Sequence, residues 1–125
     1  MPRILVVEDD PLNNNLICTF MRRAGHEAEG VHGGRDALRR FHEDAFDLVL
    51  MDVQMPEMSG TDVMRVMKTA KEDVPVIAVT AYALQGDRES LLAEGFDEYV
   101  PKPIDVARLT SVVAEQIAES KKGIS

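Results

Sequence analysis

The chain has 125 residues, of which 45% are hydrophobic, and this length and composition suit one compact domain with its own core. Its 22 Asp and Glu residues outnumber 14 Lys and Arg residues, and the formal net charge of −8 disfavours direct binding of nucleic acid. A single cysteine, Cys18, excludes an intramolecular disulfide, and no apolar run approaches the roughly 20 residues of a membrane-spanning helix. We therefore expect one cytoplasmic domain over residues 1–125, with a core from about 3 to 119 and no membrane partner.

The first predicted elements are a strand and a helix joined by an acidic corner. Residues 4–7 are apolar and predict a buried strand, which is followed by Glu8, Asp9 and Asp10. Pro11 suits the first turn of a helix that ends near Gly25. Apolar residues at every fourth position predict the buried face of this helix: Leu12, Leu16, Phe20 and Ala24. The three asparagines at positions 13–15 are expected to face water.

The alternation of strand and helix continues to the end of the chain. Residues 26–31 form a weaker strand candidate, before a helix that is expected to bury Ala37, Leu38 and Phe41. Residues 47–52 predict the central strand, and Ser59 is expected to cap a helix that buries Val63, Met67 and Ala70. Residues 74–80 predict a further strand, and the helix from about 85 to 94 has so few apolar residues that it should be the least firmly packed element. Residues 97–100 predict the last strand, and the terminal helix is expected to bury Val106, Leu109, Val113, Gln116 and Ile117.

Five strands that alternate with five helices predict an α/β fold with a parallel sheet covered on both sides. We expect the flavodoxin-like doubly wound five-stranded sheet with the strand order 2-1-3-4-5. Sheets of this kind bind ligands at the carboxyl ends of the strands, where the strand order reverses. The polar residues that follow the strands should therefore converge on one small pocket. They are Glu8, Asp9, Asp10, Asp52, Thr80 and Lys102.

Such a pocket gathers carboxylates that repel one another unless a divalent cation lies among them. Mg²⁺ is the expected ion, with Mn²⁺ as an alternative, because Mg²⁺ usually takes one or two carboxylates and keeps positions that a phosphoryl oxygen can enter. With that charge in place, Asp52 can act as a nucleophile toward phosphorus. Thr80 and Lys102 would then offer a hydroxyl and an ammonium group to the other phosphoryl oxygens.

Four short motifs occur in a fixed order: VVEDD at 6–10, LMDVQMPEMSG at 50–60, VTA at 79–81 and KP at 102–103. In this combination the chain resembles, over essentially its whole length, the CheY-like receiver domain of two-component response regulators. The resemblance implies that Glu8 and Asp9 form an acidic pair. It also implies that Asp9 and Asp52 bind Mg²⁺ together with the backbone carbonyl of Gln54.

The same resemblance assigns further roles. Asp52 would accept a phosphoryl group from the phosphohistidine of a histidine kinase or a histidine phosphotransfer protein. Thr80 would be the switch hydroxyl, Tyr99 the switch aromatic residue, and Lys102 the phosphate-binding lysine, followed by a cis peptide bond to Pro103. Gln54 and Tyr82, each two positions past a site residue, are expected to line the path of the hydrolytic water and to tune the lifetime of the phosphoryl group.

The expected function is a switch rather than steady catalysis. Phosphorylation should bias the face formed by the helix at about 85–94, the strand at 97–100 and the terminal helix, and a downstream protein would bind there. We expect a monomer, and the sequence leaves open whether phosphorylation drives dimerisation. The start at Met1, almost directly in the first strand, and the short segment after the last helix favour a stand-alone receiver of the cell-cycle or phosphorelay type, without an output domain. A receiver excised from a hybrid histidine kinase is the alternative.

Two other classes of protein share parts of this pattern. A haloacid-dehalogenase-like phosphatase also uses an aspartate nucleophile and Mg²⁺, but its nucleophile belongs to a D-x-D motif. In this chain Gln54 occupies the position of the second acid of that motif. A flavodoxin-like flavin carrier needs a phosphate-binding loop after the first strand, where the acidic residues 8–10 would repel the phosphate. The three histidines, His26, His32 and His42, lack metal-ligand spacing and are expected at the surface.

Overall fold

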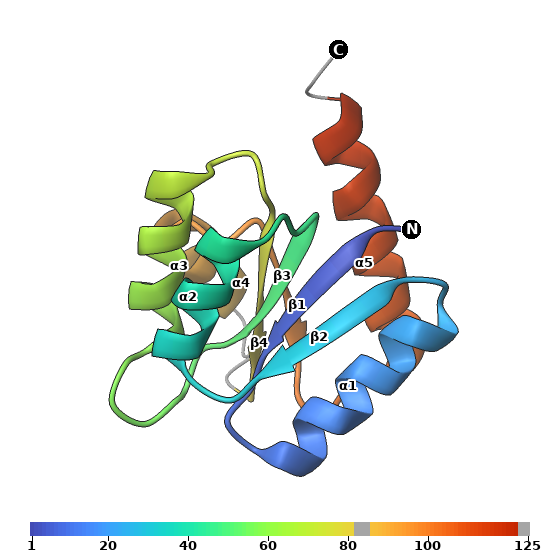
Figure 1. Cartoon of the computed structure of the whole chain (residues 1–125), viewed down its shortest axis with the longest axis horizontal. Helices are drawn as coiled ribbons and strands as arrows, with labels where there is room; N and C mark the ends of the chain where they lie inside the picture. Colours follow the sequence, from blue (N-terminus) through green and yellow to red (C-terminus); the bar gives the residue numbers. More distant parts are fainter. Residues whose placement is uncertain (82–85, 123–125) are drawn as a thin grey trace.

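The computed structural model describes residues 1–81 and 86–122 and shows one parallel sheet between two layers of helices (Figure 1). The strands are β1 (Arg3–Val7), β2 (Glu27–Val31), β3 (Leu48–Asp52), β4 (Val76–Thr80) and β5 (Glu98–Pro101). The helices are α1 (Pro11–Arg23), α2 (Gly34–Glu43), α3 (Gly60–Ala70), α4 (Asp87–Glu94) and α5 (Val106–Lys122). The order β2-β1-β3-β4-β5 confirms the predicted fold and topology.

The central strands are apolar on both faces because helices cover both sides of the sheet. Along β1, Ile4 and Val6 belong to a cluster with residues of α1 and α5, whereas Leu5 and Val7 belong to a second cluster with residues of α2, α3 and α4. Figure 1 shows the same division, with α1 and α5 on one side of the sheet and the other three helices on the opposite side. The period of two along each strand thus divides the core between the two helical layers.

The predicted buried face of α1 is wrong. Leu12 is 77% exposed and Leu16 is 46% exposed, Ala24 is also exposed, and Phe20 is half-buried. The buried side chains of α1 are Asn14, Ile17, Cys18 and Met21, so the expectation that all three asparagines face water also fails at Asn14. Apolar residues recur at helical spacing on two sides of this helix, and periodicity alone gives no reason to prefer one side. The contact with the sheet selects the side that carries Ile17 and Met21.

The other helices follow the predicted pattern more closely. In α2, Ala37 and Phe41 are buried and Leu38 is half-buried, and in α3 the residues Val63 and Met67 are buried while Ala70 is exposed. In α5, Leu109, Val113 and Ile117 are buried, Gln116 is half-buried and Val106 is 43% exposed. In α4 the one buried side chain is Leu91. Residues 82–85, at the predicted start of this helix, lie outside the described part of the chain.

Helix ends also agree with the sequence at the points where a capping side chain was expected. The Ser59 hydroxyl accepts a hydrogen bond from the Asp62 backbone N–H at the start of α3.

Among the histidines, His32 and His42 are exposed as predicted, but His26 is half-buried, and this burial lowers its pKa. No helix of the described residues is long and apolar enough to cross a membrane.

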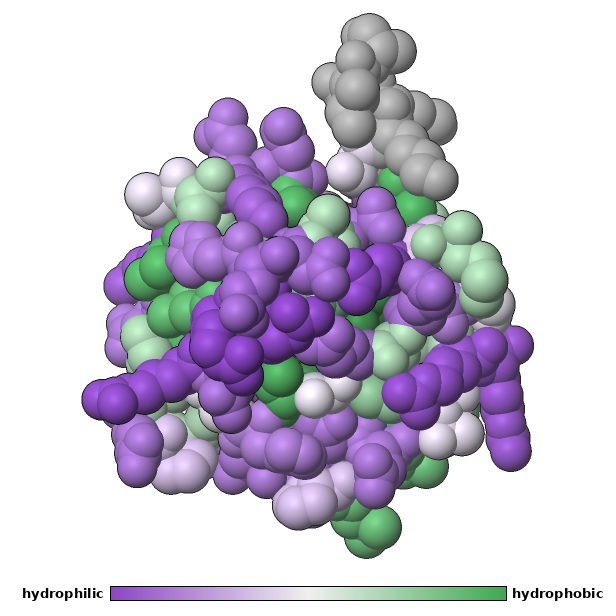
Figure 2. Space-filling view, in the orientation of Figure 1, coloured by the Kyte–Doolittle hydropathy of each residue, from purple (hydrophilic) through white to green (hydrophobic). Residues whose placement is uncertain are grey.

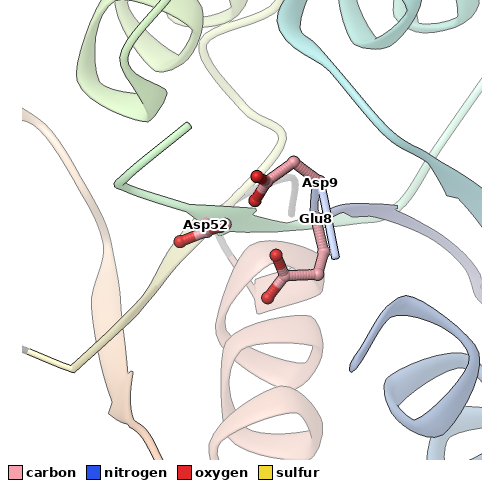
Figure 3. Close-up of side chains that lie close together, drawn as sticks. All are labelled: Glu8, Asp9 and Asp52. Carbon is pink, nitrogen blue, oxygen red and sulfur yellow. The ribbon is translucent and has the colours of Figure 1, made fainter. Parts of the chain in front are cut away.

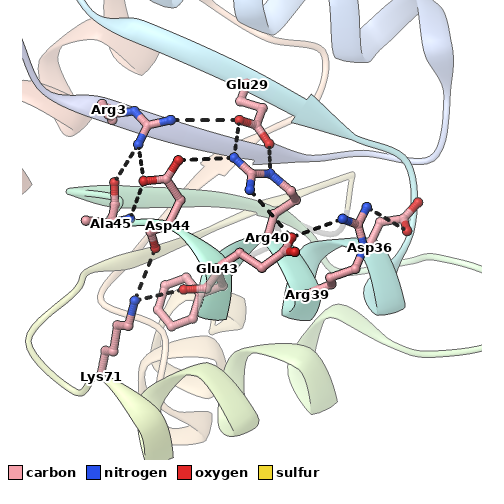
Figure 4. Close-up of polar contacts among 10 residues, drawn as sticks. Arg3, Glu29, Asp36, Arg39, Arg40, Glu43, Asp44, Ala45 and Lys71 are labelled. Carbon is pink, nitrogen blue, oxygen red and sulfur yellow. Dashed lines mark hydrogen bonds and ion pairs between the residues drawn. The ribbon is translucent and has the colours of Figure 1, made fainter.

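A network of ion pairs fastens the amino-terminal end of β1 to the end of α2 (Figure 4). The Arg3 guanidinium lies 2.6 Å from Asp44, and the Arg40 guanidinium contacts both Glu29 of β2 and Asp44. The hydrogen bond from Arg3, with a second from the Ala45 backbone N–H, holds the pKa of Asp44 well below its usual range. This network lies at the edge of the sheet opposite to the carboxyl ends of the strands.

Candidate functional site

Adjacent parallel strands bring the predicted acidic residues together at the carboxyl edge of the sheet. β1 pairs with β3 in a register that sets Val7 opposite Met51, so the next residues, Glu8 and Asp52, follow neighbouring strand ends. Their side chains are 1% and 3% exposed, respectively, and Asp9 is half-buried. One carboxylate oxygen from each of Glu8, Asp9 and Asp52 lies within 4.8 Å of the others. Figure 3 shows the carboxylates of Glu8 and Asp9 turned toward the end of β3, where Asp52 lies.

Lys102 supplies a positive charge beside this cluster. Its backbone N–H donates to the Thr80 carbonyl at 2.8 Å, and the peptide bond between Lys102 and Pro103 is cis, as predicted. The ammonium nitrogen lies 2.8 Å from Glu8 Oε1 and 3.4 Å from Asp52 Oδ1. Burial opposes the charge of Lys102, but the two carboxylates outweigh this effect and raise its pKa.

The cluster contains more negative than positive charge. Burial and the nearby carboxylates of Glu8 and Asp9 raise the pKa of Asp52 to about 7, although Lys102 acts in the opposite direction. Glu8 Oε1 is buried, and the positive charge that it faces is the Lys102 ammonium, 2.8 Å away. Lys102 does not fully compensate the charge of the three carboxylates. Carboxylate oxygens are the ligands that a hard divalent cation prefers, and the residues present therefore fit Mg²⁺.

The loop after β3 keeps its backbone close to Asp52. The Gln54 backbone N–H donates to Asp52 Oδ1 at 3.2 Å, while the Gln54 side chain is exposed. Gly60 returns the chain to β3, since its N–H donates to the Val53 carbonyl at 2.9 Å. A Cβ atom at Gly60 would lie 2.3 Å from the Asp52 carbonyl oxygen, so this approach needs glycine. The proposed role of the Gln54 carbonyl as a metal ligand stays a prediction.

Thr80 and Tyr99 lie on the two neighbouring strands. Thr80 is 2% exposed at the end of β4, and Asp52 pairs with Val79, the residue before it. Tyr99 of β5 is half-buried and pairs with Ala78. The structure therefore places Thr80 beside the acidic cluster, at the end of β4. Tyr99 lies further from this carboxyl edge of the sheet, because it pairs with Ala78. Tyr82, the second residue predicted to tune hydrolysis, lies outside the described residues.

Two polar residues near the cluster have structural roles that the sequence did not reveal. Asp10, the third acid of the corner, caps α1, because its carboxylate accepts from the Leu12 backbone N–H at 3.0 Å. Asn14 is 2% exposed, and its side-chain amide donates to the backbone carbonyls of Glu8 and Val31. A D-P pair is a capping signal that could have identified Asp10, whereas nothing in a run of three asparagines distinguishes the buried one.

An apolar groove opens directly beside the acidic cluster. It has a volume of about 420 Å³ and lies between the start of α1 and the segment that follows Lys102. Leu16, Ile17, Pro103 and Ile104 line it together with Glu8 and Lys102. The groove therefore joins an apolar surface of α1 to the charged pocket.

The sequence and the fold are similar to those of proteins of known class. The family model of the response regulator receiver domain matches residues 4–114. The chain is 37% identical over 123 residues to the polar-differentiation response regulator DivK of Brucella anthropi, which covers 96% of this chain and all of DivK. It is 41% identical over 117 residues to the sensor protein GacS of Pseudomonas syringae, but this match spans 90% of the chain and 13% of GacS.

A solved structure adds the same fold with a bound ion. The receiver domain of the sensor histidine kinase PA1611 from Pseudomonas aeruginosa, with a magnesium ion coordinated in its active site cleft, has a TM-score of 0.85 and 35% identity. The match covers 94% of this chain and 98% of that one. The doubly wound sheet, the acidic pocket at its carboxyl edge and these relatives together identify the class of protein as a phosphoacceptor signalling domain. The chain belongs to the response regulator receiver domain family of two-component systems.

The raised pKa of Asp52 predicts how stability depends on pH. Between about pH 4 and 7 the metal-free folded protein keeps a proton at Asp52 that the unfolded chain has released, so the free energy of unfolding falls as pH rises and levels off above about 7. Asp52→Asn should remove this slope and, without metal at pH 7.5, should raise the free energy of unfolding by about 1–2 kcal/mol. Urea unfolding with and without Mg²⁺ measures both effects, and saturating Mg²⁺ should reduce the difference. An Asp52 carboxyl that titrates near about 4 without metal would contradict the prediction.

Proposed function

We propose that Asp52 is the phosphoacceptor of this receiver domain and takes its phosphoryl group from a phosphohistidine on a histidine kinase or histidine phosphotransfer protein. The observation that supports this assignment is the position of the Asp52 carboxylate, which is buried at the end of β3 between the carboxylates of Glu8 and Asp9 and the ammonium of Lys102. A nucleophile in this position can receive a highly charged group only where cations surround it.

Glu8, Asp9 and Asp52, with the Gln54 carbonyl, would hold Mg²⁺. The bound ion supplies positive charge that keeps Asp52 ionised and neutralises the incoming phosphoryl oxygens. An Asp52 carboxylate oxygen forms a bond to phosphorus while the bond from phosphorus to the donor nitrogen breaks, and the imidazole keeps the electron pair of that bond. The Lys102 ammonium and the Thr80 hydroxyl donate hydrogen bonds to phosphoryl oxygens.

The domain stores the phosphoryl group as a signal rather than turning over substrates. Gln54 stands where a D-x-D phosphatase has its second acid, so no carboxylic acid at that position can protonate a leaving group. Its exposed side chain, with Tyr82, would instead set how long the acyl phosphate lasts. We also propose the stand-alone arrangement with output through protein contacts, because the match to DivK extends over the whole of that relative.

Replacing the nucleophile tests the assignment. Asp52→Asn should abolish stable labelling of the metal-loaded protein by acetyl phosphate, since the amide oxygen is a poor nucleophile, while the circular dichroism spectrum stays unchanged. Asp62→Asn is the matched control, because Asp62 is an exposed acid in the first turn of α3 and should leave labelling intact. Undiminished labelling of Asp52→Asn, or steady release of p-nitrophenol from p-nitrophenyl phosphate by the wild type, would refute the assignment.

The apolar groove beside Lys102 is the proposed docking surface for the phosphodonor protein. Leu12 and Leu16 project from the side of α1 that does not pack on the sheet, and Leu16 also lines the groove next to Glu8 and Lys102. In the space-filling view most of the visible face is hydrophilic, and apolar atoms protrude at the lower edge of the molecule, at the end where α1 begins (Figure 2). A donor that covers these leucines would bring its phosphohistidine to the pocket and exclude water from it.

A negative charge introduced at this surface should distinguish a protein phosphodonor, which must dock there, from a small phosphodonor such as acetyl phosphate. With a histidine phosphotransfer protein that labels the wild type, Leu16→Asp should lower the rate of phosphotransfer about tenfold or more. The rate of labelling by acetyl phosphate should stay unchanged. Val66→Asp introduces the same charge at a residue of α3 that is 41% exposed on the other side of the sheet, and it should affect neither reaction. Equal rates of protein-mediated transfer to wild type and Leu16→Asp would exclude this docking surface.

The face formed by α4, β5 and α5 is the proposed output surface. Thr80 and Ala78 point to the same side of β4, and Tyr99 pairs with Ala78, so a movement of Thr80 toward a phosphoryl group opens space beside the Tyr99 ring. The Arg108 guanidinium of α5 lies 5.1 Å from the centre of that ring. Since α4 buries a single side chain, Leu91, it has little packing to resist a change on this face.

The switch can be followed by NMR. Addition of beryllofluoride and Mg²⁺ should shift the backbone amides of residues 87–94 and the ring signals of Tyr99, because the phosphoryl mimic draws Thr80 inward. Thr80→Ala should still bind the mimic but should lose most of the shifts in α4. If the α4 amides of the wild type stay in place while the amide of Val53 moves, the switch proposal is wrong.

A further inference from the structure

The side-chain amide of Asn14 joins three parts of the structure in the interior, just behind the acidic pocket. Its nitrogen donates to the Glu8 carbonyl at 3.1 Å and to the Val31 carbonyl at 2.9 Å. Its oxygen lies 3.5 Å from the Cys18 thiol, one turn further along α1. The amide thus connects α1 to the residues at the carboxyl ends of β1 and β2.

The orientation of this amide follows from chemistry. Both near neighbours of its nitrogen are carbonyl oxygens, which accept hydrogen bonds, so the reverse orientation would set the amide oxygen against them. The Glu8 backbone N–H also donates to the Val31 carbonyl, at 3.1 Å. Hydrogen bonds therefore hold both peptide groups that flank the Glu8 Cα atom, one directly on β2 and the other through Asn14.

Gly30 on β2 leaves the space that this amide fills. A Cβ atom at Gly30 would lie 2.0 Å from the Asn14 side-chain oxygen and 2.9 Å from its carboxamide carbon, so any larger residue would displace the amide. Gly30 does not have a positive φ, so space rather than backbone conformation requires glycine here. Asn14 and Gly30 therefore form a matched pair on two different elements.

We propose that Asn14, in the space left by Gly30, is a positioning residue that holds the Glu8–Asp9 peptide group so that both carboxylates face Asp52. The carbonyl that accepts from Asn14 belongs to the peptide group between Glu8 and Asp9, and its direction sets the starting orientation of the Asp9 side chain. Without the amide this carbonyl would be buried without a donor and would turn toward water, and Asp9 would turn with it. The inference rests on the proposed function, because Glu8 and Asp9 are the residues proposed to bind Mg²⁺.

The position of Asn14 distinguishes this role from ordinary packing. A residue that serves the core alone would be replaceable by an apolar side chain of similar size, and its loss would lower stability without a specific effect on the pocket. Asn14 instead donates both of its amide hydrogens to backbone carbonyls. One of these carbonyls belongs to the peptide group that joins Glu8 to Asp9, two of the three clustered acidic residues. Residues that orient metal ligands in this way typically change metal affinity about 10–100-fold when they are removed.

Mg²⁺ binding measured by isothermal titration calorimetry separates the two roles, with thermal unfolding as the second measurement. Gly30→Ala should raise the dissociation constant for Mg²⁺ about tenfold and should lower the Tm, because the new methyl group displaces the amide. Combining Asn14→Ala with Gly30→Ala removes the clash but also the hydrogen bond to the Glu8 carbonyl, so the Tm should rise above that of Gly30→Ala while the dissociation constant stays about tenfold above that of the wild type. The amide signals of Asp9 and Asp10 should shift in both proteins.

Met21→Ala is the control, because Met21 is fully buried on the same face of α1 but has no part in the acidic pocket. It should lower the Tm and leave the dissociation constant for Mg²⁺ within about twofold of the wild type. Wild-type affinity in the protein that carries Asn14→Ala and Gly30→Ala would overturn the positioning role while leaving the proposed function intact. A wild-type protein that does not bind Mg²⁺ would overturn the proposed function and this inference together.

Discussion

Repulsion among three carboxylates is the constraint on which the rest of this structure depends. Glu8, Asp9 and Asp52 lie within 4.8 Å of one another, and two of them are almost fully buried. A folded protein tolerates this arrangement only when positive charge compensates it, which Lys102 does in part. The remaining deficit fits a divalent cation and, in the proposed function, would let that cation bring a phosphoryl group to Asp52. In the proposed function, the same electrostatic imbalance that costs stability would therefore provide the chemistry.

The parallel sheet makes this imbalance possible because it delivers polar residues to one edge without disturbing the core. The strands β1, β3 and β4 are apolar along most of their length, and a polar residue comes where each of them ends. The charged network around Arg3 and Asp44 lies at the opposite edge and pairs its charges fully enough to lower the pKa of Asp44, whereas burial and repulsion raise the pKa of Asp52 to about 7. At one edge of the sheet the charges are paired and stabilise the structure. At the other edge the carboxylates are only partly compensated, and this is the edge of the proposed functional site.

Helix α1 has an apolar residue where solvent is expected and a polar residue where the core is expected. Leu12 and Leu16 lie on its exposed side, next to the groove at the pocket, whereas Asn14 lies inside and donates to the backbone of the acidic corner. Both departures from a simple amphipathic helix occur in its first two turns, beside the functional edge of the sheet. The later turns, with Ile17 and Met21 buried, follow the usual rule.

The sequence by itself determined the alternation of strands and helices and the residues at the strand ends, because these depend on local periodicity, whereas the strand order 2-1-3-4-5 was expected from the likeness to a known type of doubly wound fold. It also predicted which side chains, Glu8, Asp9, Asp52 and Lys102, would meet at one edge. Only the tertiary structure decided which side of α1 faces the sheet and that Asn14 fills the space above Gly30. Such choices depend on contacts between residues far apart in the chain, where the fit of one side chain against another leaves no periodic trace in the sequence.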